Sequence, residues 1–370
     1  MLIGVPKEIK PQEGRVGLTP EAVQEYVAHG HDVMVQTGAG AGIGADDDAY
    51  RAAGARIAPD AASIFAVAGM IVKVKEPQPA EWTMLRAGQI LFTYLHLAPD
   101  PAQTRGLLAS GVTAVAYEMV GDGHGLPLLT PMSEVAGRLA IEAAAIASRG
   151  HMGGKGLLLG GVPGVAPARV VVLGGGVVGT HAARMAVGLG AEVTILDRAL
   201  PRLRQLDELF QGRVRTRYSS RAAIEAEIRA ADVVVGAVLV PGAAAPRLIT
   251  RQMLALMAPG TVLVDVAIDQ GGCFETSRPT THEAPTYVVD GIIHYCVANM
   301  PGAVPRTSSQ ALNNATLPYG LALADGGLAA IAASPALLAG LSVHRGHLTS
   351  APVAEALALP FTPPQDALAL

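Results

Sequence analysis

Residues 169–198 have the sequence RVVVLGGGVVGTHAARMAVGLGAEVTILDR. The apolar run VVVL is short and rich in β-branched residues, which is typical of a strand buried on both faces. Gly174, Gly176 and Gly179 follow it, then an Ala-rich helical segment, then a second apolar run that ends at Asp197. This order of strand, glycine-rich turn, helix and strand predicts a βαβ unit that carries the fingerprint of a dinucleotide-binding site.

The spacing of these residues gives each of them a physical role. Gly174 permits the tight turn, Gly176 lets the backbone approach a pyrophosphate, and Gly179 lets the helix pack closely on the strand. The pyrophosphate would lie at the helix N-terminus, where free N–H groups and the helix dipole favour an anion. Asp197 can accept hydrogen bonds from both ribose hydroxyls and would repel a 2′-phosphate, so we expect NAD rather than NADP.

The composition limits the class of protein. Of the 370 residues, 50% are hydrophobic and 16% are charged, so the chain can form two domains with ample cores and is not disordered. The net charge is −4 and no basic run is present. A nucleic-acid-binding surface is therefore not expected.

Three features of the sequence help to predict the cellular compartment of the protein. Cys273 and Cys296 are the only cysteines, which suits a reducing compartment better than a disulfide framework. The chain opens with a strand-like LIGV and then charges, unlike a signal peptide. The apolar stretch 328–343 contains Pro335 and is too short for a membrane span. We expect a cytoplasmic protein without a membrane partner.

The first third of the chain also alternates strands and helices, which predicts a second α/β domain. Lys75 and His96 end two of its strand-like runs, 71–75 and 89–96. Ligands of open α/β sheets collect beyond the carboxyl ends of strands, so this pair is a candidate site. Each residue alone also fits a structural interpretation, either as a solvated lysine or as a histidine that stabilises a turn.

Later segments extend this pattern. Asp269 follows a buried run at 261–266, where it fits either a functional carboxylate or an Asx turn. A second glycine-rich loop, 38–44, precedes three aspartates that would repel a pyrophosphate, so we expect a structural turn there. The residues from about 307 onward are rich in Ala and Leu, and we expect them to be mostly helical and to pack on the first domain.

A series of motifs, in order from residue 1 to about 325, resembles the alanine dehydrogenase family, which also includes transhydrogenase α subunits. The motifs are PKE, EGRVGLTP, KVKEP, ILFTYLHLA, LLTPMSEVAGRLA, GAVLVPGA, LVDVAIDQGGCFETSRPTTH and YCVANMPGAVPRTSSQALNNATLPY. The resemblance implies an α/β fold of two Rossmann-like, doubly wound domains with a cleft between them. The expected substrate (catalytic) domain is 1–128 plus 306–370, and the expected NAD-binding domain is 129–305.

The resemblance also implies an activity in amino-acid metabolism. As an oxidoreductase of L-alanine catabolism, the protein would reversibly convert L-alanine, NAD⁺ and water to pyruvate, ammonia and NADH. The family is typically hexameric, so a homohexamer is expected. The expected partners are small-molecule substrates, and no metal ion is assigned.

Carried over by motif, the resemblance assigns His96 and Asp269 to catalysis, and Arg15 and Lys75 to substrate binding. The implied cofactor-binding residues are Ser133, Gly174, Gly176, Val178, Gly179, Asp197, Arg202, Ser219, Val238, Leu239, Ile268, Asp269, Asn299 and Met300. These residue types suit the chemistry, because Arg15 can hold a carboxylate through two N–H groups and histidine transfers protons near neutral pH. Asp269 would either take a proton from the attacking water or only orient it.

Three other functions compete with this one. The α subunit of a proton-translocating transhydrogenase has a similar fold and opening motif, but it does not need His96 or Lys75 for amino-acid chemistry. A related reductase, such as one that forms saccharopine, would use a larger substrate. A non-catalytic NAD sensor would need neither His96 nor Asp269.

NADP is expected to be a poor cofactor, because the Asp197 carboxylate would repel its 2′-phosphate. The measurement is kcat/KM for NAD and for NADP with the same substrate. Comparable values for the two cofactors would remove this role from Asp197.

Overall fold

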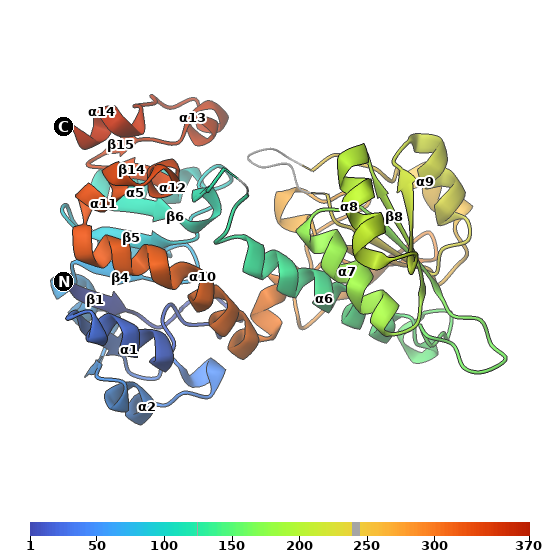
Figure 1. The fold of residues 1–370 in the computed structure, drawn as a ribbon, viewed down its shortest axis with the longest axis horizontal. Coiled ribbons are helices and arrows are strands. Elements are labelled where there is room, and N and C mark those ends of the chain that lie inside the picture. Colours follow the sequence, from blue (N-terminus) through green and yellow to red (C-terminus); the bar gives the residue numbers. More distant parts are fainter. Residues whose placement is uncertain (124, 239–244) are drawn as a thin grey trace. The chain divides into compact units, whose positions relative to one another are not determined.

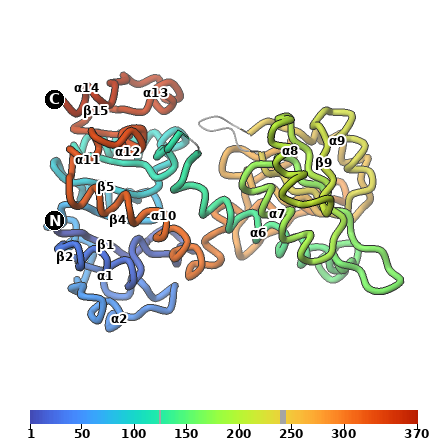
Figure 2. The backbone as a smooth tube through the Cα atoms, in the orientation of Figure 1, coloured from blue at the N-terminus to red at the C-terminus, as the bar shows by residue number. Residues whose placement is uncertain are grey.

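The computed structural model describes residues 1–123, 125–238 and 245–370 (Figure 1). The chain divides into two compact units. The first unit contains Met1–Met132 and Gly302–Leu370, and the second contains Ser133–Pro301. The chain therefore leaves the first unit once and returns to it, as the tube in Figure 2 allows the reader to follow.

The first unit is built on an eight-stranded sheet in the order β15-β14-β6-β5-β4-β1-β2-β3. The strands are β1 (Leu2–Val5), β2 (Asp32–Gln36), β3 (Arg56–Ala58), β4 (Met70–Val72), β5 (Ile90–Thr93), β6 (Thr113–Ala116), β14 (Leu341–His344) and β15 (His347–Leu348). The first six are parallel and follow the doubly wound order 3-2-1-4-5-6. The winding therefore reverses between β1 and β4, and this is where such sheets bind ligands.

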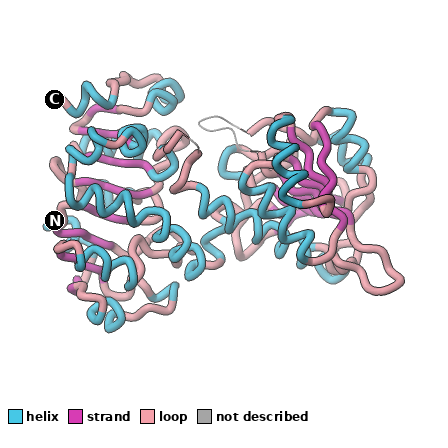
Figure 3. Tube along the Cα trace, in the orientation of Figure 1, coloured by secondary structure: helices cyan, strands magenta, loops and turns pink. Residues whose placement is uncertain are grey.

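Helices surround the strands of this unit (Figure 3). They are α1 (Pro20–Ala28), α2 (Asp47–Ala52), α3 (Ala61–Val67), α4 (Pro79–Trp82), α5 (Pro101–Ser110), α10 (Pro305–Gly326), α11 (Leu328–Ala333), α12 (Pro335–Gly340), α13 (Ala351–Leu357) and α14 (Pro364–Leu368), with short 3₁₀ helices η1 (Ala41–Ile43) and η2 (Tyr117–Met119). The start of α1 shows how local sequence determines where a helix begins. The Thr19 side chain caps the helix by accepting from Ala22 N, and Pro20 occupies the first helical position.

The second unit has a seven-stranded sheet in the order β12-β13-β11-β10-β7-β8-β9. Its strands are β7 (Arg169–Leu173), β8 (Glu192–Asp197), β9 (Val214–Tyr218), β10 (Val233–Gly236), β11 (Val262–Asp265), β12 (Thr286–Val289) and β13 (Ile292–Tyr295). All are parallel except β12. Without β12 the order is again 3-2-1-4-5-6, with the reversal between β7 and β10.

The helices of the second unit complete its Rossmann-like fold. They are α6 (Thr130–Ala147, of which the first three residues belong to the first unit), α7 (Val177–Gly188), α8 (Leu200–Phe210) and α9 (Arg221–Ile228), with the 3₁₀ helices η3 (Gly150–Met152), η4 (Arg251–Leu256), η5 (Ile268–Gln270) and η6 (Met300–Ala303, which ends in the first unit). Strand β7 is buried on both faces as predicted, because Val170 and Val172 lie in one core cluster and Val171 and Leu173 in another. The predicted fold class, α/β with two Rossmann-like doubly wound domains, is confirmed.

The prediction for the residues from about 307 onward is confirmed, because they are mostly helical and belong to the first unit, although they also contain two short strands. Strand β14 pairs antiparallel with β6, and β15 pairs antiparallel with β14. A segment of four residues carries little periodicity of its own, so its extended form comes from pairing with the edge of an existing sheet. Residues Arg251–Leu256 form the 3₁₀ helix η4.

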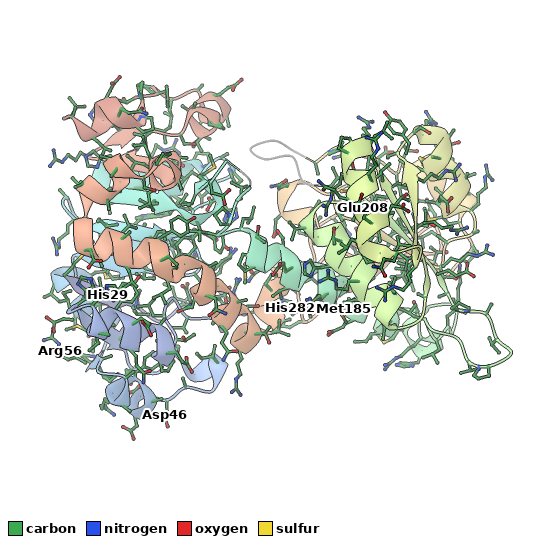
Figure 4. All side chains as sticks on the ribbon, in the orientation of Figure 1. His29, Asp46, Arg56, Met185, Glu208 and His282 are labelled. Carbon is green, nitrogen blue, oxygen red and sulfur yellow. The ribbon has the colours of Figure 1, made fainter. Side chains whose placement is uncertain are left out.

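The glycine-rich loop at 38–44 is held by the aspartates that follow it. The Asp47 carboxylate accepts from Thr37 Oγ1 at 2.6 Å and from Gly38 N at 2.8 Å. Asp46, labelled in Figure 4, caps α2 by accepting from Ala49 N at 2.9 Å. These carboxylates fix the loop itself, in agreement with a structural turn. Among the helices of the described residues, none is long and apolar enough to span a bilayer.

Candidate functional site

The residues of the first unit that were predicted to bind the substrate or to act in catalysis follow neighbouring strands. Arg15 lies in the loop after β1, Lys75 is the third residue after β4, and His96 is the third residue after β5. These three strands are adjacent and parallel, so their carboxyl ends share one edge of the sheet. The structure thus brings the three residues to the edge where the winding reverses.

Arg15 is a buried cation whose orientation is fixed by a carboxylate. Its side chain is 2% exposed, and it donates from Nε and Nη2 to the two carboxylate oxygens of Glu13 at 2.7 and 2.6 Å. Its Nη1 also lies 3.1 Å from Met132 Sδ. Burial alone would lower the pKa of Arg15, but the hydrogen bonds and charge of Glu13 raise it above its usual value. Arg15 therefore stays cationic, as binding of a carboxylate requires.

Lys75 lies in a more charged environment. Its side chain is only 12% exposed, and Nζ is 3.7 Å from Glu76 Oε2. Glu76 also pairs with Lys10. Burial would raise the pKa of Glu76, but Lys75 and Lys10 together lower it, so the carboxylate stays ionised. The backbone of Lys75 is held on both sides, since its N–H donates to Glu8 Oε1 at 3.3 Å and its carbonyl accepts from Thr93 Oγ1 at 3.0 Å.

His96 is exposed and has an unusual backbone conformation. Its φ is +48°, a region that residues other than glycine seldom adopt. The turn is held by Glu118, whose Oε1 accepts from His96 N at 2.6 Å and from Leu95 N at 3.2 Å. The ring centroids of His96 and Tyr94 are 5.8 Å apart. Glu118 was missed by the sequence prediction, because it follows a different strand, β6, and no motif connects it to His96.

Tyr94 lies next to His96 in this group. It is fully buried and donates from its hydroxyl to Leu128 O at 2.6 Å. Burial raises its pKa above the usual value despite the nearby charge of Arg15, so the phenol stays neutral. Tyr94 therefore shapes the site without adding charge to it.

In the second unit, the fingerprint glycines have the geometry that a dinucleotide site needs. Gly174 has φ +101°, which favours glycine. A Cβ on Gly179 would lie 1.8 Å from the carbonyl oxygen of Gly174, so only glycine fits there. By contrast, a Cβ on Gly176 would meet no atom within 4 Å. This open space lies at the position where the motif lets a pyrophosphate approach the backbone.

Asp197 ends β8 and is hydrogen-bonded through both carboxylate oxygens. Oδ2 accepts from Gly175 N at 2.7 Å, and Oδ1 accepts from Ala199 N at 2.8 Å. Arg202 turns toward the same loop, where its Nε donates to Gly175 O at 2.6 Å and its Nη2 donates to Thr180 Oγ1 at 2.7 Å. Both side chains thus brace the fingerprint turn, in addition to any role in binding ribose.

Most other predicted cofactor residues follow strand ends of this sheet. The residues that do so are Ser219 after β9, Val238 after β10, Ile268 and Asp269 after β11, and Asn299 and Met300 after β13. Val178 is in the first turn of α7, and Ser133 is on α6. The carbonyl of Asn299 lies 3.3 Å from Nε2 of His282, which is labelled in Figure 4. Leu239 lies outside the described residues.

The loop that carries Asp269 is tied to a buried carboxylate. Asp265 is fully buried and accepts from Ala267 N at 3.2 Å, Cys273 N at 2.8 Å, Phe274 N at 3.3 Å and Ser277 Oγ. Burial raises the pKa of Asp265, although these donors oppose the rise. Asp269 is exposed within this closed loop. The sequence analysis missed Asp265, because this residue lies within the buried run 261–266.

The described part of the chain contains no group of three or more His, Cys, Asp or Glu residues that could hold a metal ion. Both cysteines are buried free thiols, and burial raises the pKa of Cys273 to about 12. The first unit therefore offers cations, a histidine and carboxylates for acid–base chemistry, and the second unit has a sheet edge of its own that is suited to a dinucleotide.

Comparison with known proteins agrees with this chemistry. The model of the alanine dehydrogenase/PNT N-terminal domain matches residues 4–136, and that of the C-terminal domain matches residues 140–351. The chain belongs to this family. The family predicted from the sequence motifs is confirmed, and with it the prediction of an NAD-dependent oxidoreductase.

Individual relatives show the same relationship. Alanine dehydrogenase of Halomonas elongata is 60% identical over 363 residues, which cover 98% of each chain. A solved structure of an L-alanine dehydrogenase matches with a TM-score of 0.94 at 52% identity, covering 97% of this chain and 99% of the other. The transhydrogenase of Sinorhizobium meliloti matches with a TM-score of 0.82 at 26% identity, covering 95% and 99%. This chain is therefore more similar to these two alanine dehydrogenases than to this transhydrogenase.

Two alanine substitutions test the cofactor edge. Gly179→Ala is expected to lower the melting temperature and abolish NADH binding, because its Cβ would collide with the Gly174 carbonyl. Gly176→Ala is the matched control: its Cβ meets no protein atom, so the protein should keep its melting temperature but bind NADH more weakly. Calorimetric titration with NADH and thermal melting measure both effects. Unchanged NADH affinity in Gly176→Ala would argue against a pyrophosphate at this position.

Proposed function

We propose that this chain is an NAD-dependent L-alanine dehydrogenase that reversibly converts L-alanine, NAD⁺ and water to pyruvate, ammonia and NADH. The observation that carries the proposal is the grouping of Arg15, Lys75 and His96 at one sheet edge, in a chain 60% identical to a relative named alanine dehydrogenase. Substrate binding is assigned to 1–128 with 306–370, and NAD binding to 129–305.

The two cations bind the substrate. Arg15 pairs with the α-carboxylate, and its planar guanidinium suits a carboxylate better than a lysine would. Lys75 donates a hydrogen bond to the carboxylate or to the carbonyl oxygen of pyruvate. Together the two cations offset negative charge on the substrate and on the oxygen that develops at Cα. Glu13 supports this role by fixing two of the N–H groups of Arg15.

The histidine transfers protons, and the aspartate assists the attacking water. When NAD⁺ is bound, it supplies the hydride acceptor for the Cα hydrogen of alanine. Water then adds to Cα of the resulting iminium, and the carbinolamine loses ammonia. His96 gives and takes the protons of these steps, a role that histidine side chains commonly have in enzymes. Asp269 assists the attacking water, either as the base or by orienting it.

The cofactor fits the second unit. The open space over Gly176, the turn at Gly174 and the carboxylate of Asp197 are suited to a pyrophosphate and a ribose without a 2′-phosphate. The residues that would hold NAD are Ser133, Gly174, Gly176, Val178, Gly179, Asp197, Arg202, Ser219, Val238, Leu239, Ile268, Asp269, Asn299 and Met300.

We also propose a homohexamer in the cytoplasm. Exposed apolar side chains on one loop support assembly, since Leu158, Val162 and Val165 are 67%, 54% and 61% exposed and such surfaces commonly meet a partner. The two free cysteines are consistent with a reducing compartment.

The direct test is NADH production at alkaline pH with L-alanine, compared with glycine, L-serine, L-lysine and no amino acid. The reverse reaction uses pyruvate, ammonium and NADH. Turnover that depends on alanine in one direction and on pyruvate in the other supports the proposal. Turnover with lysine would favour a larger-substrate reductase, and tight NADH binding without turnover would favour a transhydrogenase-like or sensing protein.

His96→Ala is expected to lower kcat by roughly 10²-fold or more, because the proton transfers lose their acid and base. NADH binding should stay near that of the wild type. Steady-state kinetics and NADH titration provide the two measurements. A parallel loss of NADH affinity would instead indicate that His96 has a structural role.

Arg15→Met is expected to raise the KM for L-alanine and for pyruvate far more than the KM for NAD⁺, because the substrate carboxylate loses its cation. The melting temperature should also fall, since the buried Glu13 loses its guanidinium partner. Initial rates at varied substrate and at varied cofactor separate the two KM values. An unchanged KM for alanine would remove Arg15 from the substrate site.

A further inference from the structure

The motif KVKEP contains a second lysine that the proposed mechanism does not use. Lys73 is 0% exposed, whereas a fully buried lysine is rare unless it is paired. Its Nζ lies 3.0 Å from Glu8 Oε2 and 2.8 Å from Glu81 Oε1. Glu8 and Glu81 are themselves buried, with 6% and 1% of their surface exposed. We call these three residues the Lys73 cluster.

The Lys73 cluster connects directly to the backbone of Lys75. While Oε2 of Glu8 accepts from Lys73, its Oε1 accepts from Val74 N at 2.7 Å and from Lys75 N at 3.3 Å. Glu8 follows β1, and Lys73 follows β4. The cluster therefore ties together the two strand ends at which the winding of the sheet reverses.

Glu81 fixes the other end of the same segment. Its Oε1 accepts from Lys73 Nζ, and its Oε2 accepts from Gln78 N at 2.8 Å at the start of α4. The Thr93 hydroxyl on β5 also donates to the carbonyl of Lys75. The segment from Lys73 to Gln78 is thus held at both ends and in the middle.

An ion cluster of this kind is a poor choice for stability alone. Burying three charged groups carries a large desolvation cost, and apolar residues of similar volume often stabilise a fold as well or better. One ammonium also faces two carboxyl groups, and burial raises the pKa of one of them, Glu8. What it provides beyond stability is a defined geometry, because each partner has a fixed direction.

We propose that Glu8, Lys73 and Glu81 are positioning residues that set the location of the Lys75 ammonium for the substrate. This inference rests on the proposed function, in which Lys75 contacts the substrate. The two lysines of the KVK sequence then have different roles. Lys73 anchors the segment inside the fold, and Lys75 places its charge at the sheet edge. In an extended segment, residues i and i+2 lie on the same face, so Lys73 and Lys75 would point the same way. Glu8 accepts from Val74 N and Lys75 N, and the turn that these bonds hold after β4 separates the two lysine side chains.

The test uses Lys73→Met, which keeps the length of the side chain and removes its charge. We expect the KM for L-alanine and pyruvate to rise about tenfold, while NADH affinity stays within about twofold, because only substrate binding depends on Lys75. Hydrogen–deuterium exchange of the Val74 and Lys75 amides should become faster. Lys7→Met, at an exposed lysine of the adjacent loop, is the matched control and should change neither property.

Glu81→Gln provides a milder variant in case Lys73→Met does not fold. It keeps the size and one oxygen acceptor, so it should shift KM and amide exchange in the same direction by less. Folded variants with wild-type KM and wild-type exchange would overturn the proposal, and so would a loss of kcat without a change in either. A wild-type protein without alanine turnover would overturn the proposed function, and amide exchange in the variants would then decide whether the cluster holds the segment.

Discussion

Backbone N–H groups just beyond the strand ends are held by carboxylates, and the candidate site depends on this interaction. A strand that ends at a sheet edge leaves N–H groups without ladder partners, and these groups need acceptors. Glu8 accepts from Val74 and Lys75, Glu118 accepts from Leu95 and His96, and Asp265 accepts from Ala267 and Cys273. Each pair of bonds fixes a turn beside a residue proposed to act in the reaction.

The two units share one sheet topology but carry different residues at the edge where the winding reverses. Both parallel sheets follow the order 3-2-1-4-5-6, so each has one edge where the winding reverses and loops diverge. In the first unit that edge carries cations and a histidine. In the second it carries glycines that leave open backbone, and Asp197 braces the turn through Gly175 N. The same strand order thus presents residues suited to acid–base chemistry in one unit and residues suited to dinucleotide binding in the other.

Charge in the first unit is arranged in local pairs. Glu13 accompanies Arg15, Glu76 accompanies Lys75, and Glu8 with Glu81 accompanies Lys73. Each carboxylate restricts the direction of its cation, so little reorganisation is needed when a small anionic substrate binds. This pairing explains how a site with several cations can exist next to the core of a sheet.

The sequence alone determined the elements with strong local signals: the βαβ fingerprint, both α/β halves and the family motifs that single out Arg15, Lys75 and His96. Short-range pattern and glycine geometry suffice for these features. Tertiary structure was needed for strands β14 and β15, which exist by pairing with β6, and for Glu13, Glu118, Asp265 and the Lys73 cluster. Most of these partners are distant in sequence, such as Lys73, 65 positions from Glu8, and Glu118, 22 positions from His96. A contact of that kind has no periodicity along the chain, so only the packing of parallel strands brings its two ends together.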